Sequence, residues 1–270
     1  MKLDLSVLDP THYEQAVVPR HGTRLGSMLL EKLDPELRGT VLEVACRTGW
    51  FTAELLKRVH RSGRIVAIDP DARHVEAARL RLLETDGKRT FFKCGAIVPL
   101  PFGDHVFDII VGNPALAGTG WITEAAADLR RALQPRGQLV FADMLRGTFE
   151  EMLDMVREAA LAKDLDAVVE RVDAAIAEAP TKARLLGLLH NHELSDVDIE
   201  TESLKWTFRN ARTMMKDPLV AAVALPAWKR LCPADGETSI LDEAAHALDT
   251  YFAGSPVSLR IEVAVIVARG

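Results

Sequence analysis

Two carboxyl groups, each within or at the end of a short apolar segment, are the first candidates for chemistry in this sequence. Glu43 lies in TVLEVAC, which runs into the loop 45–49, and Asp69 ends RIVAID. Small residues in such a loop let backbone N–H groups and a helix N-terminus approach a bound cofactor closely. Asp69 can also cap the following helix, a role that Asp71 can fill instead. The pattern indicates a ligand-binding loop, although it also fits a generic strand–turn–helix unit.

Alternating strands and helices must position these residues. The predicted strands are short and nearly continuously apolar, as strands covered on both faces are. Between them, apolar residues recur at helical spacing over about 49–60, 71–85 and 122–133. The strands of this half are, in chain order, 40–46, 64–69, 89–94, 107–112 and 137–143. This order predicts a parallel, doubly wound α/β sheet with right-handed crossovers.

The second half of the chain begins with a long helical stretch. Residues 147–193 are almost purely helical in pattern, which predicts a helical insertion between the fifth and sixth strands. The sixth strand is expected within 197–208, and the β-branched segment 257–269 is expected to be the seventh. The chain is therefore interpreted as a single domain of 1–270. Its expected parts are an N-terminal helical cap (1–38), a cofactor half (39–146), the helical insertion (147–193) and C-terminal strands and helices (194–270).

Several segments together resemble one known family. They are VLEVACRTGWFTAELL, CGAIVPLPFGDHVFDIIVGNPAL, RRALQPRGQLVFAD and the closing IEVAVIVAR. In this order and at this spacing they are similar to class I S-adenosylmethionine-dependent methyltransferases, particularly the small-molecule enzymes of ubiquinone and biotin pathways. The resemblance implies a Rossmann-like, seven-stranded sheet whose last strand is antiparallel. It also implies S-adenosylmethionine as the cofactor, with Asp69 accepting hydrogen bonds from both ribose hydroxyls.

The resemblance can be carried over to individual positions. The implied cofactor-binding residues are Glu43, Ala45, Cys46, Arg47, Gly49, Asp69, Ala96, Ile97 and Asn113. No catalytic residue is assigned, because alignment of a good leaving group with its acceptor lowers much of the barrier to methyl transfer. Tyr13, Trp121 and Asp143 are candidates for lining an acceptor pocket.

Two of these positions depart from the family pattern. Arg47 stands at the middle glycine of the loop, where its side chain either blocks the cofactor or pairs with the cofactor's carboxylate. Ala96 replaces the acidic residue that receives the adenine amino group, and stacking by Ile97 can retain the ring. Asn113 and Pro114 resemble half of an amino-methyltransferase signature and fit a tight turn equally well, so nitrogen methylation is not inferred.

Composition excludes several other classes of protein. The net charge of −6 and the isoelectric point of about 5.8 argue against a broad nucleic-acid surface. The cysteines, Cys46, Cys94 and Cys232, are scattered, and no metal-ligand spacing occurs, so neither a disulfide framework nor a metal is expected. The absence of a long apolar run and of a signal peptide predicts no membrane span and a cytoplasmic location.

Two functions therefore compete. The first is a methyltransferase acting on a small or medium organic acceptor. The second is a catalytically inactive relative that uses the fold as a binding or scaffolding module, with a protein partner in place of an acceptor. A nicotinamide oxidoreductase is disfavoured because the loop lacks G-x-G-x-x-G. The sequence leaves the oligomeric state open.

Overall fold

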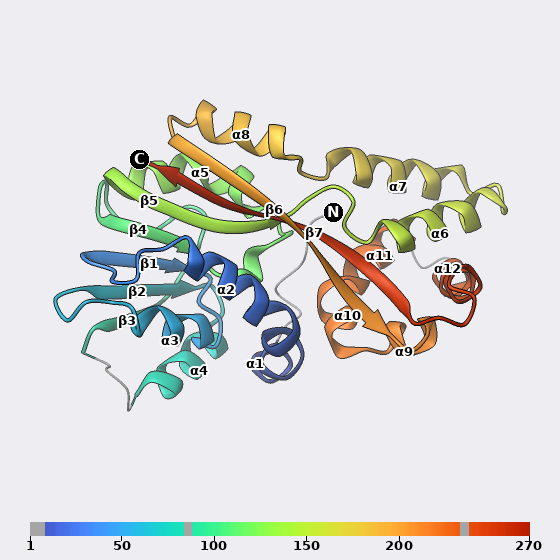
Figure 1. Cartoon of the computed structure of the whole chain (residues 1–270), viewed down its shortest axis with the longest axis horizontal. Helices are drawn as coiled ribbons and strands as arrows, with labels where there is room; N and C mark the ends of the chain where they lie inside the picture. Colours follow the sequence, from blue (N-terminus) through green and yellow to red (C-terminus); the bar gives the residue numbers. More distant parts are fainter. Residues whose placement is uncertain (1–8, 84–87, 233–237) are drawn as a thin grey trace. The chain divides into compact units, whose positions relative to one another are not determined.

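The computed structural model describes residues 9–83, 88–232 and 238–270, and its strands form a seven-stranded sheet flanked by helices (Figure 1). The strand order is β3-β2-β1-β4-β5-β7-β6. The strands are β1 (Thr40–Val44), β2 (Arg64–Asp69), β3 (Thr90–Cys94), β4 (Phe107–Gly112), β5 (Leu133–Met144), β6 (Ser195–Phe208) and β7 (Val257–Arg269).

The direction of the strands follows from their pairing. The pairs β1–β2, β1–β4, β2–β3 and β4–β5 are all parallel. Next to β5, the backbone N–H of Arg136 donates to Gly270 and that of Leu145 donates to Glu262. Residue numbers increase along β5 while those of their β7 partners decrease, so β7 is antiparallel to β5. The predicted seven-stranded sheet with an antiparallel last strand is confirmed.

Helices occupy the connections between strands. The first half of the chain contains α1 (Pro10–His12), the π-helix η2 (Tyr13–Gly22), α2 (Thr23–Glu31), α3 (Trp50–Leu56), α4 (Ala72–Leu82), the short 3-10 helix η3 (Pro114–Leu116) and α5 (Trp121–Ala132). The second half contains α6 (Glu150–Leu161), α7 (Asp166–Glu178), α8 (Lys182–Asn191), α9 (Ala211–Met215), α10 (Pro218–Val223), α11 (Leu225–Leu231) and α12 (Thr238–Tyr251). Three helices thus lie between β5 and β6, which confirms the helical insertion.

Four strands differ in extent from the sequence prediction. The strand expected over 89–94 begins at Thr90, and the strand expected within 197–208 begins at Ser195. The strand expected over 40–46 ends at Val44, because Ala45 adopts a positive φ of 59° that no strand accommodates. The strand expected over 137–143 instead begins at Leu133, which pairs with Phe107 across a register shift. Pro135 at this edge lacks an N–H and therefore reads as loop in the sequence.

The chain divides into two compact units. One contains Met144–Thr181 and Thr201–Val263, and the other contains the described residues up to Asp143 together with Lys182–Glu200 and Ala264–Gly270. The strands β6 and β7 therefore contribute residues to both units, and the predicted insertion is shared, with α6 and α7 in the first unit and α8 in the second. That the chain forms a single domain therefore stays a prediction.

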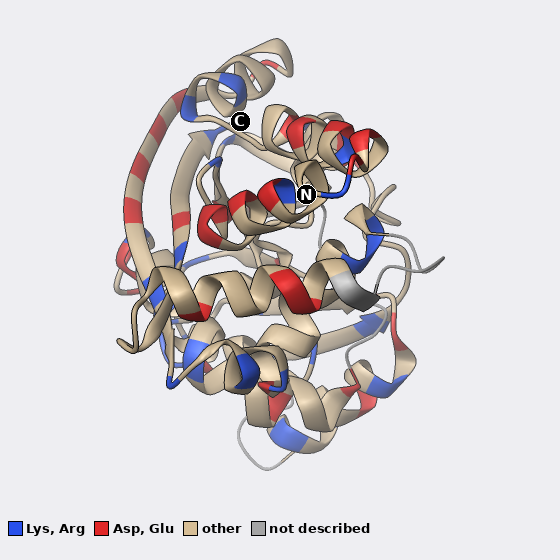
Figure 2. Ribbon diagram, turned by 90° about the vertical axis from the view of Figure 1, so that its right-hand side faces the viewer, with Lys and Arg blue, Asp and Glu red and all other residues tan. Residues whose placement is uncertain are grey.

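The distribution of basic residues and the hydropathy of the helices agree with two expectations from composition. Figure 2 shows Lys and Arg positions spread over many helices and strands instead of being gathered along one of them. Within the described ranges, no helix combines the length and apolar character needed to cross a bilayer.

Candidate functional site

The carboxyl ends of the central parallel strands bring the predicted site residues together. Parallel strands end at the same edge of a sheet, and ligands of open α/β sheets bind outside that edge. Asp69 ends β2, and Asn113 directly follows β4. Between them, Glu43 on β1 lies opposite Ala67 of β2 and Val111 of β4. Three polar side chains from separate parts of the sequence thus meet at one edge.

Glu43 is a fully buried carboxyl held by two side-chain donors. Asn113 Nδ2 donates to Glu43 Oε1 at 2.7 Å, and Thr52 Oγ1 donates to Glu43 Oε2 at 2.5 Å. Burial raises the pKa of Glu43 to about 8, and the nearby Asp69 carboxylate adds to this rise, while both hydrogen bonds oppose it. Glu43 is therefore protonated and uncharged at neutral pH.

Asp69 is also fully buried, and donors from within the chain reach both of its oxygens. Its Oδ2 accepts from the backbone N–H of Arg47 at 2.9 Å, and its Oδ1 accepts from that of Asp71 at 2.9 Å. The cap of α4 is Asp71, whose side chain accepts from the backbone N–H of Arg73. The alternative that Asp69 caps this helix therefore does not hold.

The loop between β1 and α3 is built from left-handed residues. Ala45, Arg47 and Gly49 have φ values of 59°, 50° and 72°. A Cβ added to Gly49 would lie 2.8 Å from the Cβ of Ala78 on α4, so close packing and backbone conformation both call for glycine here. Burial raises the pKa of the Cys46 thiol well above its ordinary value, which makes this cysteine a packing residue.

Arg47 lies inside the site. Its side chain is only 2% exposed, and its Nη1 is 3.7 Å from Asp69 Oδ1. On another side, its guanidinium carbon lies 5.6 Å from the centre of the Tyr13 ring, within cation–π range. The sequence left two directions open for this side chain, and in this structure it is directed at Asp69.

The bend after β3 holds the remaining two predicted cofactor residues. Ala96 is exposed and Ile97 is half-buried. The bend lies beside the end of β2, because Cys94 pairs with Asp69 and the backbone N–H of Gly95 donates to the Asp69 carbonyl at 3.0 Å. Ala96 has no side-chain acceptor to offer an adenine amino group, as expected from the sequence.

Residues of the N-terminal segment complete the site and were largely missed by the sequence analysis. Tyr13 of η2 is buried, and its hydroxyl donates to Asn113 Oδ1 at 3.2 Å. Its neighbour Glu14 accepts from the Thr48 hydroxyl and forms an ion pair with Arg81 at 2.6 Å. No local pattern marks these partners, since they depend on where the N-terminal segment packs.

The other polar candidates have structural partners. Asn113 accepts from the backbone N–H of Ala115 at 2.9 Å, so it caps η3 as a turn residue while it also contacts Glu43. Asp143 is buried and accepts from the backbone N–H of Gly118 at 2.7 Å. Trp121 packs edge-on against Phe141 in the core. None of these contacts identifies an acceptor pocket.

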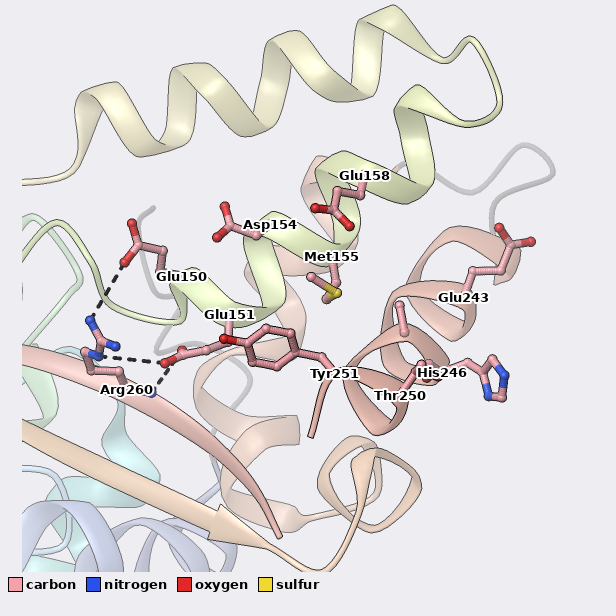
Figure 3. Close-up of a pocket in the computed structure, with 11 residues that line it drawn as sticks. Glu150, Glu151, Asp154, Met155, Glu158, Glu243, His246, Thr250, Tyr251 and Arg260 are labelled. Atoms are coloured by element: carbon pink, nitrogen blue, oxygen red, sulfur yellow. Dashed lines mark hydrogen bonds and ion pairs between the residues drawn. The ribbon is translucent and has the colours of Figure 1, made fainter. Parts of the chain in front are cut away.

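A groove lies in the unit that contains α6 and α12. It has a volume of about 730 Å³ and is lined by acidic residues of both helices, together with Tyr251 and the positively charged Arg260. Figure 3 shows the carboxylates of α6 on one wall and Tyr251 on the other. Arg260 pairs with Glu151 at 3.7 Å. No predicted cofactor residue lines this groove.

Comparison with known proteins finds similarity to methyltransferases. A family model described as a methyltransferase domain matches residues 41–137. Malonyl-[acyl-carrier protein] O-methyltransferase of Erwinia pyrifoliae is 30% identical over 128 residues, which cover 47% of this chain and 45% of that protein. Demethylmenaquinone methyltransferase of Lactococcus lactis is 29% identical over 101 residues, covering 37% and 40%.

A solved structure supports the fold over more of the chain. Phosphoethanolamine N-methyltransferase 2 of Haemonchus contortus, in complex with S-adenosyl-L-methionine, superposes with a TM-score of 0.55 at 11% identity. The match covers 96% of this chain and 56% of that one. The two sequence relatives are each matched over less than half of their length. Together these matches confirm the resemblance to methyltransferases, in sequence over residues 41–137 and in fold over most of the chain.

Proposed function

We propose that the chain transfers a methyl group from S-adenosylmethionine to a small or medium organic acceptor, as the methyltransferase-domain match over residues 41–137 supports. One observation carries this proposal. Glu43 and Asp69 lie on adjacent parallel strands, on either side of a left-handed loop that ends in Gly49. A carboxylate after the second strand and an open backbone loop after the first suit a nucleoside with a charged amino-acid arm.

The residues present fit this cofactor in chemical type. Asp69 offers carboxylate oxygens to a ribose diol, and Gly49 lets the backbone come close to a ligand. Both Asp69 oxygens already accept bonds within the chain, and the Arg47 guanidinium lies beside them. The fit is therefore one of donor and acceptor types, and it requires the Arg47 side chain to leave Asp69.

The chemistry divides between the cofactor and the chain. When bound, S-adenosylmethionine supplies a methyl group on a sulfonium, which is a good leaving group. The chain's task is to bind and orient the two reactants, and a proton-abstracting residue is not required by this chemistry. Asn113 sits at the end of β4 between Glu43 and Tyr13, so it can position groups at the edge of the sheet.

We propose no specific methyl acceptor beyond a small or medium organic molecule. The relatives act on malonyl-[acyl-carrier protein] and on demethylmenaquinone, and phosphoethanolamine is methylated by the structural neighbour, according to their names. These acceptors share no functional group, and the residues around Asn113 contain no feature that selects one of them.

Calorimetric titration with S-adenosylmethionine and S-adenosylhomocysteine tests the proposal. We expect the wild-type chain to bind both, and Asp69→Ala to weaken binding by about 1–3 kcal/mol because buried hydrogen bonds to the ribose are lost. Asp69→Asn keeps the shape of the side chain and is expected to weaken binding in the same direction.

His192→Ala is the control, since His192 lies just beyond α8, in a segment that contains none of the candidate site residues. It should leave both affinities unchanged. Equal losses in the Asp69 and His192 variants would show that the site lies elsewhere. Failure of the wild type and of every variant to bind either compound would contradict the methyltransferase proposal and favour a scaffolding module.

A further inference from the structure

Arg47 has two features that are unusual for a residue in a ligand-binding loop. It is a non-glycine residue at a φ of 50°, a left-handed conformation that side chains of this size rarely adopt. Its long charged side chain is nevertheless 98% buried, since only 2% remains exposed. A buried guanidinium is retained only where charged or aromatic partners replace water, so its partners define its role.

The main partner is the carboxylate that the proposed cofactor would use. Arg47 reaches Asp69 twice, through its backbone N–H at 2.9 Å and through Nη1 at 3.7 Å. The backbone N–H of Asp71 takes the other oxygen. A carboxylate has about four lone-pair sites. The two backbone donors use two of these sites. Because Asp69 is fully buried with the guanidinium beside it, two ribose hydroxyls can reach the remaining sites only when the guanidinium moves.

The N-terminal segment keeps the guanidinium in this position. The Tyr13 ring covers it at 5.6 Å, and the Tyr13 hydroxyl is tied to Asn113 at the same edge of the sheet. One residue further on, Glu14 is bound to the loop through the Thr48 hydroxyl and to α4 through Arg81. Arg81 Nε also donates to the Thr48 carbonyl at 3.0 Å. The N-terminal segment, the loop 45–49 and α4 are thus linked to one another around Arg47.

We propose that Arg47 is an affinity-setting residue that occupies the cofactor site from within the chain, by holding Asp69 until a ligand's ribose hydroxyls displace its guanidinium. This inference rests on the proposed function, because it takes the ribose to bind at Asp69. A ligand that must first displace an internal partner binds with an affinity reduced by the fraction of molecules in the open arrangement. Removing the internal partner therefore strengthens binding, the opposite of what a ligand-binding arginine would show.

The test compares binding of S-adenosylhomocysteine and adenosine by calorimetry. In Arg47→Gly the side chain is gone and the left-handed backbone is relaxed, so we expect both ligands to bind about tenfold more tightly, the factor for an open arrangement that about one tenth of wild-type molecules adopt. Arg47→Met keeps a long side chain without charge, and it should also bind both ligands more tightly than wild type. If Arg47→Gly fails to fold, the binding affinity of Arg47→Met tests the proposal instead.

Arg136→Gly is a matched control. Arg136 also has a positive φ, 66°, but it is exposed at the edge of β5, and the bond from its backbone N–H to Gly270 is kept by glycine. Its affinity for both ligands should equal that of wild type, which separates loss of the guanidinium from relaxed backbone strain.

The outcomes distinguish the inference from the function on which it rests. Wild-type binding that is unchanged in Arg47→Gly and Arg47→Met would overturn the inference and leave the proposed function intact. Weaker binding of S-adenosylhomocysteine with unchanged binding of adenosine would also overturn it, because Arg47 would then pair with the amino-acid carboxylate. Failure of all variants to bind either ligand would overturn both.

Discussion

The buried carboxyl of Glu43 predicts an unusual dependence of stability on pH. Burial raises its pKa from 4.5 to about 8 in the folded chain. Between these two values the folded state keeps a proton that the unfolded state releases, so the unfolded state is favoured as the pH rises. The contribution of Glu43 to stability is therefore fully present below pH 4.5 and is lost as the pH rises toward 8.

The variant that isolates this effect is Glu43→Gln. An amide has the shape of the protonated carboxyl, its oxygen can accept from Asn113, and its NH₂ group can donate to the Thr52 hydroxyl. It has no proton to lose in this range. Each pH unit between the two pKa values is worth about 1.4 kcal/mol, so the stability of the variant relative to wild type should rise by up to about 5 kcal/mol between pH 4.5 and pH 8.

Urea unfolding followed by far-ultraviolet circular dichroism at pH 5, 6, 7 and 8 measures this difference. Subtracting the two variants at each pH removes shared groups such as His21, whose pKa burial lowers to about 4, so that its effect has the opposite direction with pH. Glu54→Gln, which alters a surface carboxylate paired with Lys57, controls for loss of a carboxyl group as such. A difference between wild type and Glu43→Gln that stays constant from pH 5 to 8 would refute the assignment of Glu43 as neutral.

Two further changes test the loop and its surroundings. Gly49→Ala should lower the free energy of unfolding by about 1–3 kcal/mol, because the new Cβ meets Ala78 at 2.8 Å on a left-handed backbone. Gly187→Ala in α8, where a Cβ meets nothing within 4 Å, should instead be neutral or stabilising, and thermal unfolding of both variants measures the contrast. Ala96→Asp should strengthen S-adenosylhomocysteine binding by about tenfold in calorimetry, since it supplies an acceptor for the adenine amino group, and Ala96→Leu should not.

Local patterns were sufficient to predict most elements of the sheet. The strands at 107–112 and 257–269 were predicted with the bounds that the structure shows. Apolar continuity and β-branched residues mark a buried strand wherever it pairs, so such a segment can be recognised without knowing its neighbours. The start of β5 could not be recognised in this way, because Leu133 joins the sheet only by pairing with Phe107.

The partners of the polar site residues were decided by the tertiary structure. The sequence alone placed Glu43, Asp69 and Asn113 at strand ends, where a parallel sheet must bring them to one edge. It left Arg47 with two directions, because the direction depends on Tyr13, which the N-terminal segment brings over the loop. A buried charge takes whichever partner the fold supplies, and here that partner is Asp69, a contact between separate strand ends that no local pattern encodes.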